Sequence, residues 1–454
     1  MLFEAALLMS SVLMTTATDT SAMPQNVGIA YASVSLIQDT PSAVDAATTT
    51  SSAAAVDPAA LPTLRGLSLL QQLALLPSDS LAEFVTNNSD LMADFLASQP
   101  SAQDVSQWWA TTGIESRSTF LTVAPTLVGN LDGVPFGQRD YANRRSLVQA
   151  ESTLEKLASS EGRSELVDAT RTRHMLEQVE DALIAPPGGP ERSLLSLDTG
   201  GAGTASIVIG DLATADYVSF LVPGMFYTVD GQMVDWATAA QTLYDTEDDW
   251  MSQLAPDDPT LADASVATVA WLGYETPSMV NFTSLDLAYE GRDAIAATVN
   301  GVRELRGSDQ PFLTLVAHSY GSTAAMMALT DLGIEIDALA VVGSPGSSAQ
   351  SAADLGVPGD NVYVGEAAWD QVKDSAFFGS DPGADSFNGH VFSVDGGTDP
   401  ITGLPLGGST GHNEYFTPGC ESMRNLALIA LGRGYLITTD DSAAPVARGF
   451  AGVH

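Results

Sequence analysis

The stretch Phe312-Leu313-Thr314-Leu315-Val316-Ala317-His318-Ser319-Tyr320-Gly321 decides the fold of this chain. Its first six residues form a nearly continuous apolar run, as expected of a parallel strand that is buried on both faces. Residues 322–329, Ser-Thr-Ala-Ala-Met-Met-Ala-Leu, then suit a helix. A strand, a sharp turn at a serine and a helix are typical of a nucleophile elbow. Such an elbow needs small residues two positions before and after the serine, here Ala317 and Gly321, because the two backbones come close.

Further apolar runs on both sides of this stretch predict the rest of a sheet. They are residues 193–198, 206–211, 217–222, 267–272, 338–342, 361–365 and 390–394. The first two flank a Gly-rich segment and suggest a hairpin. The later gaps are mostly long enough for crossover helices, and residues 284–306 suit one of them. The sequence therefore predicts an α/β fold with a mostly parallel central sheet flanked by helices.

Upstream of the sheet, apolar residues recur at helical spacing until Pro186-Pro187-Gly188-Gly189 ends the pattern. We therefore expect a helical N-terminal domain without a catalytic role of its own. The expected organisation is an Ala/Ser/Thr-rich arm (1–60), the helical domain (61–185), the α/β domain (186–440) and a tail (441–454).

Composition excludes several classes of function. The chain has 56 Asp and Glu against 17 Lys and Arg, a formal charge of -39, so its overall field does not attract nucleic acid or anionic lipid. Cys420 is the only cysteine, which excludes an intramolecular disulfide and a cysteine-rich zinc module. The run from Ala5 to Met14 is too short to span a bilayer and lacks the flanking positive charge of a signal peptide. We expect a soluble protein, cytoplasmic or exported without a clear signal peptide.

A serine hydroxyl needs a neighbouring base that is itself held by a carboxylate. On folds with such an elbow, the acid follows the serine in the chain and the histidine comes last. Only His390, His412 and His454 follow Ser319. His454 is the terminal residue and His390 begins a predicted strand, whereas His412 lies in a Gly-rich loop from which a base can reach the elbow. We therefore predict His412 as the base, with His390 as the alternative.

The acid is expected in the loop after the strand 361–365. Asp370 lies in that loop and is the predicted acid, with Asp374, Asp381 and Asp395 as competitors. A rival serine also exists, because Gly407-Gly408-Ser409-Thr410-Gly411 matches the letters of the elbow pattern. No strand precedes Ser409 and no apolar helix follows it, so we expect it in a flexible loop.

Acyl transfer also requires N–H donors for the developing oxyanion. Tyr320, which follows the nucleophile, should supply one, and Met225 in Val222-Pro223-Gly224-Met225-Phe226 the second, with the Phe226 N–H as the alternative. Phe226, Trp271 and Tyr274 fall at the carboxyl ends of predicted strands, where open α/β sheets bind ligands. They are candidates for an apolar substrate pocket, although ordinary core packing explains Trp271 equally well.

At these residues the chain resembles the α/β-hydrolase superfamily, and more narrowly a largely actinobacterial α/β-hydrolase family first catalogued as a domain of unknown function. The resemblance covers roughly residues 60–435, and Ala317 replaces the glycine that is usual there. The segments that carry it are 222–225, 270–274, 317–322, 342–346 and 412–416, together with Trp108-Trp109, 129–135 and 142–145 in the helical leader. It implies a serine-hydrolase fold with Ser319 as nucleophile and His412 as base.

The sequence thus predicts an esterase, lipase-like or otherwise, that acts on a small-molecule or lipidic ester through an acyl-enzyme on Ser319, without metal or organic cofactor. Two alternatives stay open. If an alcohol outcompetes water, the same residues make an acyltransferase. In the second alternative, the chain is a non-catalytic interaction protein that uses the hydrolase fold as a scaffold.

Overall fold

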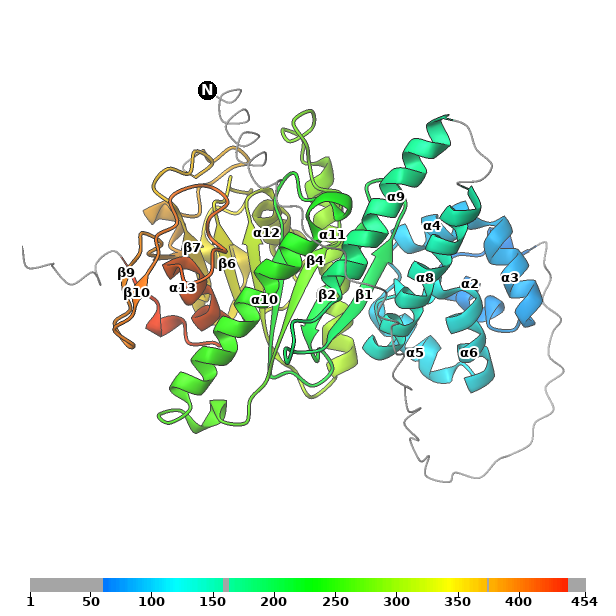
Figure 1. Cartoon of the computed structure of the whole chain (residues 1–454), viewed down its shortest axis with the longest axis horizontal. Helices are drawn as coiled ribbons and strands as arrows, with labels where there is room; N and C mark the ends of the chain where they lie inside the picture. Colours follow the sequence, from blue (N-terminus) through cyan, green and yellow to red (C-terminus); the bar gives the residue numbers. More distant parts are fainter. Residues whose placement is uncertain (1–59, 158–162, 374, 440–454) are drawn as a thin grey trace, which may run out of the picture. The chain divides into compact units, whose positions relative to one another are not determined.

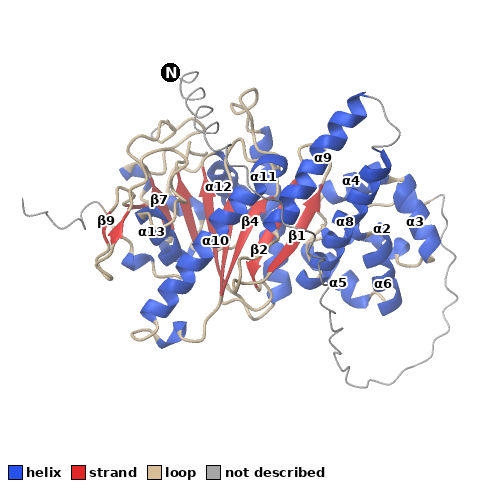
Figure 2. Cartoon of the chain, viewed as in Figure 1, coloured by secondary structure: helices blue, strands red, loops and turns tan. Residues whose placement is uncertain are grey.

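The computed structural model describes residues 60–157, 163–373 and 375–439, which belong to one compact unit. Apart from residue 60, the predicted arm (1–60) and all of the tail (441–454) lie outside the described residues, and so does Asp374. Figure 1 shows the order of the elements along the chain, and Figure 2 shows their type.

Helices alone make up the described chain before the sheet, as predicted. They are η1 (Leu61–Thr63), α2 (Gly66–Leu73), α3 (Ser78–Asn87), α4 (Ser89–Ala97), α5 (Ala102–Thr111), α6 (Ile114–Val123), α7 (Pro125–Gly129), α8 (Phe136–Leu157) and α9 (Arg163–Ala182). The shorter helices enclose an apolar core of their own, in which Trp108 packs edge-on against Phe120 with ring centroids 5.2 Å apart. Burial of this apolar core stabilises helices that are too short to be stable on their own.

The sheet has eight strands in the order β1-β2-β4-β3-β5-β6-β7-β8. Their bounds are β1 (Arg192–Asp198), β2 (Thr204–Gly210), β3 (Tyr217–Val222), β4 (Val266–Leu272), β5 (Phe312–His318), β6 (Ala338–Val342), β7 (Val362–Gly365) and β8 (His390–Phe392). The β1–β2 and β2–β4 pairs are antiparallel, and all other pairs are parallel. This confirms the predicted fold class, including the hairpin. A two-stranded ribbon of β9 (Gly397–Thr398) and β10 (Pro405–Leu406) lies outside the main sheet.

Helices cover both faces of the sheet (Figure 1). The helix α10 (Val229–Leu254) and α13 (Glu421–Ala430) contribute to the apolar core on one face, together with α9. The helices α11 (Asp286–Arg306) and α12 (Tyr320–Leu332) contribute to the core on the other face. Because both faces are covered, the parallel strands are buried along their length, which explains their continuous apolar sequences.

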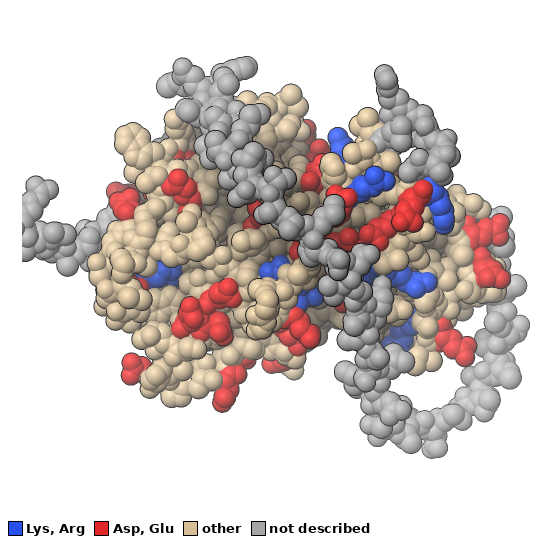
Figure 3. All heavy atoms as spheres, in the orientation of Figure 1, with Lys and Arg blue, Asp and Glu red and all other residues tan. Residues whose placement is uncertain are grey.

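The α10 face also carries much of the acidic surface visible in Figure 3, where red side chains outnumber blue ones.

The helical region protects the edge of the sheet. Asn143 in α8 donates to the carbonyl of Leu194 at 3.0 Å, and the Leu194 N–H donates to Asp140 Oδ1 at 2.7 Å. Asn130 forms a similar pair of bonds, at 2.9 and 3.0 Å, with the carbonyl and the N–H of Leu197. An exposed edge strand is a template for aggregation. These side chains therefore satisfy backbone groups of β1 on the side where no other strand of the described residues pairs with it.

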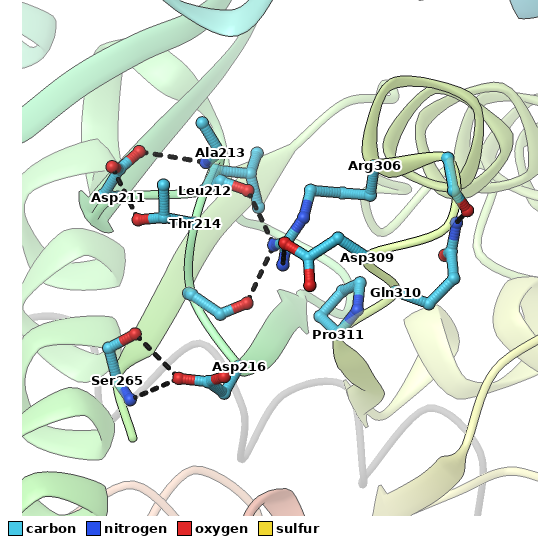
Figure 4. A network of polar contacts seen from close by, with 12 residues as sticks. Asp211, Leu212, Ala213, Thr214, Asp216, Ser265, Arg306, Asp309, Gln310 and Pro311 are labelled. Carbon is cyan, nitrogen blue, oxygen red and sulfur yellow. Dashed lines mark hydrogen bonds and ion pairs between the residues drawn. The ribbon is translucent and has the colours of Figure 1, made fainter. Parts of the chain in front are cut away.

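A buried arginine holds the loops at the amino-terminal edge of the sheet (Figure 4). Arg306 Nη1 donates to the carbonyls of Leu212 and Ala215 at 3.2 and 2.7 Å. Beside it, Asp216 accepts bonds from the N–H and hydroxyl of Ser265 at 2.8 and 3.1 Å. These contacts hold the chain where β3 and β4 begin. None of the described helices is long and apolar enough to cross a bilayer.

A carboxyl group in the core makes stability depend on pH. Glu247 of α10 is fully buried and accepts bonds from Ser219 at 2.7 Å and Thr268 at 3.2 Å. Burial raises its pKa to about 8, against the two hydroxyl bonds that lower it. The folded state therefore holds a proton that the unfolded state releases, and stability is lost as the pH rises through the folded-state pKa.

We expect the wild-type free energy of unfolding to fall by on the order of 3 kcal/mol between about pH 6 and 9 from this group alone. Glu247→Gln should flatten that decline, because the amide keeps the shape without the charge. Urea unfolding at both pH values measures the difference. Asp249→Asn on the exposed side of the same helix is the control; equal slopes for wild type and Glu247→Gln would contradict the assignment.

Candidate functional site

Ser319 lies at the turn between β5 and α12, at the carboxyl edge of the sheet. Its backbone has φ 53° and ψ -130°, a region that L-residues rarely adopt. The Ser319 N–H donates to the carbonyl of Val342 at 3.0 Å, and Ser322 donates to the Ser319 carbonyl at 2.6 Å. Ala317, the small residue two positions before the serine, is fully buried at the end of β5 and is compatible with this turn.

Close backbone approach explains two of the glycines around the serine. A Cβ at Gly321 would lie 2.3 Å from the Pro223 carbonyl oxygen, and one at Gly224 would lie 2.5 Å from Ser319 Cβ. Any side chain at these positions would force β3, β5 and α12 apart. The loop after β3 therefore lies directly against the nucleophile.

The structure brings Ser319, His412 and Asp370 into one hydrogen-bonded series. His412 Nε2 lies 2.8 Å from Ser319 Oγ, and His412 Nδ1 lies 2.9 Å from both carboxylate oxygens of Asp370. The His412 side chain is 10% exposed, whereas that of Asp370 is fully enclosed. His412 and Asp370 are therefore largely shielded from solvent, so the electrostatic interaction between them is stronger than it would be in water.

Asp370 is held as a carboxylate by its neighbours. Burial on its own would raise its pKa, but hydrogen bonds from His412, Tyr415 and the Val372 N–H outweigh burial and lower the pKa to about 2. The Tyr415 hydroxyl donates to Asp370 Oδ2 at 2.7 Å and accepts from the Ala367 N–H at 2.8 Å. Tyr415 was not predicted as a site residue. Only its place three positions after His412 could have indicated it.

A second residue outside the predicted set is Gly343, directly after β6. It has φ 58°, and a Cβ there would lie 2.6 Å from Asp370 Oδ2 and 3.0 Å from His412 Nδ1. A glycine is therefore required where the backbone passes under the acid and the base. The sequence shows a Gly-Ser-Pro-Gly segment at this position, but nothing in it points to His412.

Two N–H groups are available beside the serine. Tyr320 is the first residue of α12, so its N–H lies outside the hydrogen-bond ladder of the helix and at its positive end. The Met225 N–H lies in the loop that contacts Ser319, and no acceptor for it is found among the described residues. The alternative donor, Phe226, is occupied, because its N–H donates to the Pro277 carbonyl at 3.0 Å.

The three predicted pocket residues occupy different environments. Phe226 is half-buried in the loop after β3, with φ 70°. Trp271 and Tyr274 are buried in the core on the α11 and α12 face, and their rings stack at 5.9 Å. Tyr274 donates to the Pro223 carbonyl at 2.8 Å and so supports the loop beside Ser319. The structure does not bring the Trp271 ring to the nucleophile, because the side chain packs toward α11, where its Nε1 lies 3.3 Å from Thr298 Oγ1.

The competing residues lie elsewhere. His390 is exposed at the first position of β8, the amino-terminal end of a parallel strand, and its ring lies beside Tyr363. Asp395 is exposed, and Asp381 accepts from the Gly383 N–H in its own loop. Ser409 lies in a loop, as expected, but it is buried there: its N–H donates to the Val394 carbonyl and its hydroxyl donates to the Glu414 carbonyl. Ser409 thus holds the segment that carries His412.

Comparison with known proteins agrees with this architecture. Residues 198–380 match a protein family described as alpha/beta hydrolase. An uncharacterized protein of Mycobacterium tuberculosis is 27% identical over 396 residues, which cover 76% of this chain and 57% of that protein. The chain thus spans little more than half the length of this relative. An uncharacterized protein of Mycobacterium bovis is 30% identical over 224 residues, which cover 46% of this chain and 78% of that protein.

Among solved structures, an esterase from Rhizomucor miehei is similar at 13% identity, over 64% of this chain and 96% of that one, with a TM-score of 0.34. The assignment does not depend on this distant likeness. It follows from the family match, from the mycobacterial relatives and from the strand order with its elbow after β5. The chain therefore belongs to the α/β-hydrolase family.

Proposed function

We propose that this protein is a serine hydrolase that cleaves carboxylic esters through an acyl-enzyme on Ser319. The observation that carries the proposal is the series of short contacts from Ser319 Oγ to His412 Nε2 and from His412 Nδ1 to Asp370. A fold used only as a scaffold has no need of a strained serine, an aligned imidazole and a buried carboxylate together. Catalysis is therefore favoured over a purely structural role.

The proposed reaction assigns one role to each of these groups. His412 Nε2 accepts the proton of Ser319 as Oγ attacks the ester carbonyl carbon, and the carbonyl oxygen becomes an oxyanion. The N–H groups of Met225 and Tyr320 stabilise that oxyanion, and the end of α12 adds a favourable dipole. His412 then donates the proton to the leaving alkoxide. Water, activated by the same imidazole, releases the acid from Ser319.

Asp370 orients His412 and stabilises the imidazolium that forms during each proton transfer. Since its pKa is held at about 2, it stays ionised at neutral pH. Its favourable contribution to folding is present above its ordinary pKa of 3.8 and is lost only as the pH falls toward 2. Tyr415 acts through Asp370 and is a positioning residue.

The substrate is proposed to be a small-molecule or lipidic ester. Phe226 is the predicted pocket residue that is partly exposed in the loop beside Ser319, and we propose that it contacts the substrate. Tyr274 supports that loop through its bond to the Pro223 carbonyl, and Trp271 packs in the core beside Tyr274. Product analysis in the presence of a competing alcohol separates hydrolysis from acyl transfer, which would use the same acyl-enzyme.

A fluorophosphonate should label the wild-type protein once per chain, on Ser319, and Ser319→Ala should abolish labelling, because the probe reacts with an activated serine. His412→Ala should lower kcat for a short p-nitrophenyl ester by about 10⁴-fold or more. His390→Ala is the matched control and should retain wild-type kinetics. Loss of activity in His390→Ala with activity kept in His412→Ala would refute the assignment of the base.

Tyr415→Phe should lower kcat about tenfold with little change in KM, since one hydrogen bond to the buried carboxylate is lost. The pKa of Asp370 should rise from about 2, because that bond stabilises the ionised form. Steady-state kinetics measure the change in kcat, and urea unfolding as a function of acidic pH measures the change in the Asp370 pKa. Tyr435→Phe, at an exposed tyrosine, is the control. A Tyr415→Phe enzyme with unchanged kcat would show that the hydroxyl does not act on the acid.

Gly224→Ala should lower kcat by about 10²-fold, because the added methyl group displaces the Met225 N–H from the oxyanion. Gly137→Ala in α8, where a Cβ meets nothing within 4 Å, is the control and should leave activity unchanged. The rate of phosphonylation of Ser319 reports the same loss without turnover. Equal rates in the two variants would exclude the loop after β3 from the oxyanion site.

A further inference from the structure

His318, the residue before the nucleophile, contacts the backbone of the base. His318 Nε2 lies 2.7 Å from the carbonyl oxygen of His412. A carbonyl oxygen only accepts hydrogen bonds, so Nε2 must carry the proton and donate it. The bond joins residues 94 positions apart in the chain, the end of β5 and the segment after β10.

The surroundings of His318 keep it neutral and oriented. Its side chain is buried, with ring centroids of His412, Phe416 and Tyr415 at 4.7, 5.9 and 6.1 Å. Burial, and then the neighbouring His412, lower its pKa to about 3, so the ring adds no positive charge beside the imidazolium formed in catalysis. With Nε2 protonated, Nδ1 is a bare acceptor, and no donor for it is present in the described part of the chain.

Two contacts therefore reach His412 from one dipeptide. Ser319 Oγ meets the imidazole at Nε2 at 2.8 Å, while His318 meets the main-chain carbonyl of the same residue at 2.7 Å. His318 and Ser319 are adjacent, and the elbow fixes their backbone. The position of His412 relative to Ser319 is therefore constrained twice, at its imidazole ring and at its main-chain carbonyl. A displacement of about 1 Å in such a pair costs about 10²-fold in rate.

We infer that His318 is a positioning residue that anchors the His412 carbonyl and thereby sets the imidazole at the Ser319 hydroxyl. This inference rests on the proposed function. Its alternative is a histidine that merely fills the core under the site. The two differ in one respect: anchoring needs an N–H at the position of Nε2, whereas filling space needs only volume.

Three substitutions separate these roles. His318→Gln places an amide N–H near the position of Nε2, His318→Asn carries the same group on a shorter side chain that falls short of the carbonyl, and His318→Phe keeps the ring without a donor. We expect His318→Gln to retain kcat within about fivefold of wild type and the other two to lose about 10²-fold. KM should be unchanged, because the His318 ring is buried and not open to a substrate.

The measurements are ester kinetics and the rate and final stoichiometry of fluorophosphonate labelling. Slow labelling that still reaches one per chain in His318→Asn supports positioning, since the folded fraction is then intact. His390→Gln, which removes an exposed histidine, is the matched control and should behave as wild type. If His318→Phe does not fold, the comparison of Gln with Asn decides.

Equal kcat values for His318→Gln and His318→Asn would overturn the inference, whether both are active or both impaired. So would a loss confined to labelling stoichiometry, which reports unfolding. These outcomes are distinct from failure of the proposed function. In that case, wild-type protein would neither label at Ser319 nor turn over esters, and no comparison of His318 variants would be needed to show it.

Discussion

The conformation of one residue constrains the whole site. Ser319 has a positive φ of 53°, which costs an L-residue on the order of 1–3 kcal/mol and persists only where the surroundings over-determine it. Here a buried strand leads into the serine and a helix leads out. Gly321 and Gly224 allow the neighbouring backbone to close in, and the Val342 carbonyl fixes the serine N–H. The strained turn thus presents Oγ at the sheet edge and places the Tyr320 N–H in the first turn of α12, outside the hydrogen-bond ladder of that helix.

The partners of the serine arrive from distant parts of the chain, and buried polar contacts align them. Asp370 follows β7 and His412 follows β10, yet His412 Nδ1 lies within 2.9 Å of the carboxylate. Loops of this kind are usually mobile, but this segment is tied down by Ser409, Tyr415 and the His318 contact. Burying a charged carboxylate is expensive unless it is well bonded, and three donors meet that condition for Asp370. The same contacts therefore stabilise the fold and orient the base.

The sequence carried enough information for the fold and for the order of the reacting groups. Continuous apolar runs indicate strands that are covered on both faces. Two of these runs, residues 217–222 and 338–342, have the same bounds as β3 and β6 in the structure. The serine was separable from Ser409 because a strand and a helix must flank an elbow. His412 and Asp370 were predicted from chain order and loop position, and the structure brings both to Ser319; their catalytic roles stay a prediction.

What could not be predicted depends on contacts between residues far apart in the chain. Tyr415 and Gly343 act on Asp370 through a hydrogen bond and a close approach that no local pattern encodes. Trp271 was a pocket candidate because it ends a strand, but strand position does not reveal which side chain turns toward the core. His318 was visible only as the residue before the serine. Ser409 has the composition of a flexible loop, and its burial follows from bonds to Val394 and Glu414.

The central claim is that an activated Ser319 works together with His412 and the two N–H groups beside it. A crystal structure of the protein after reaction with a p-nitrophenyl phosphonate tests it most directly. The account predicts phosphorus bonded to Ser319 Oγ, with the phosphonyl oxygen in hydrogen-bond reach of the Met225 and Tyr320 N–H groups and His412 still paired with Asp370. An unmodified Ser319, or an adduct whose oxygen points away from both N–H groups, would contradict it.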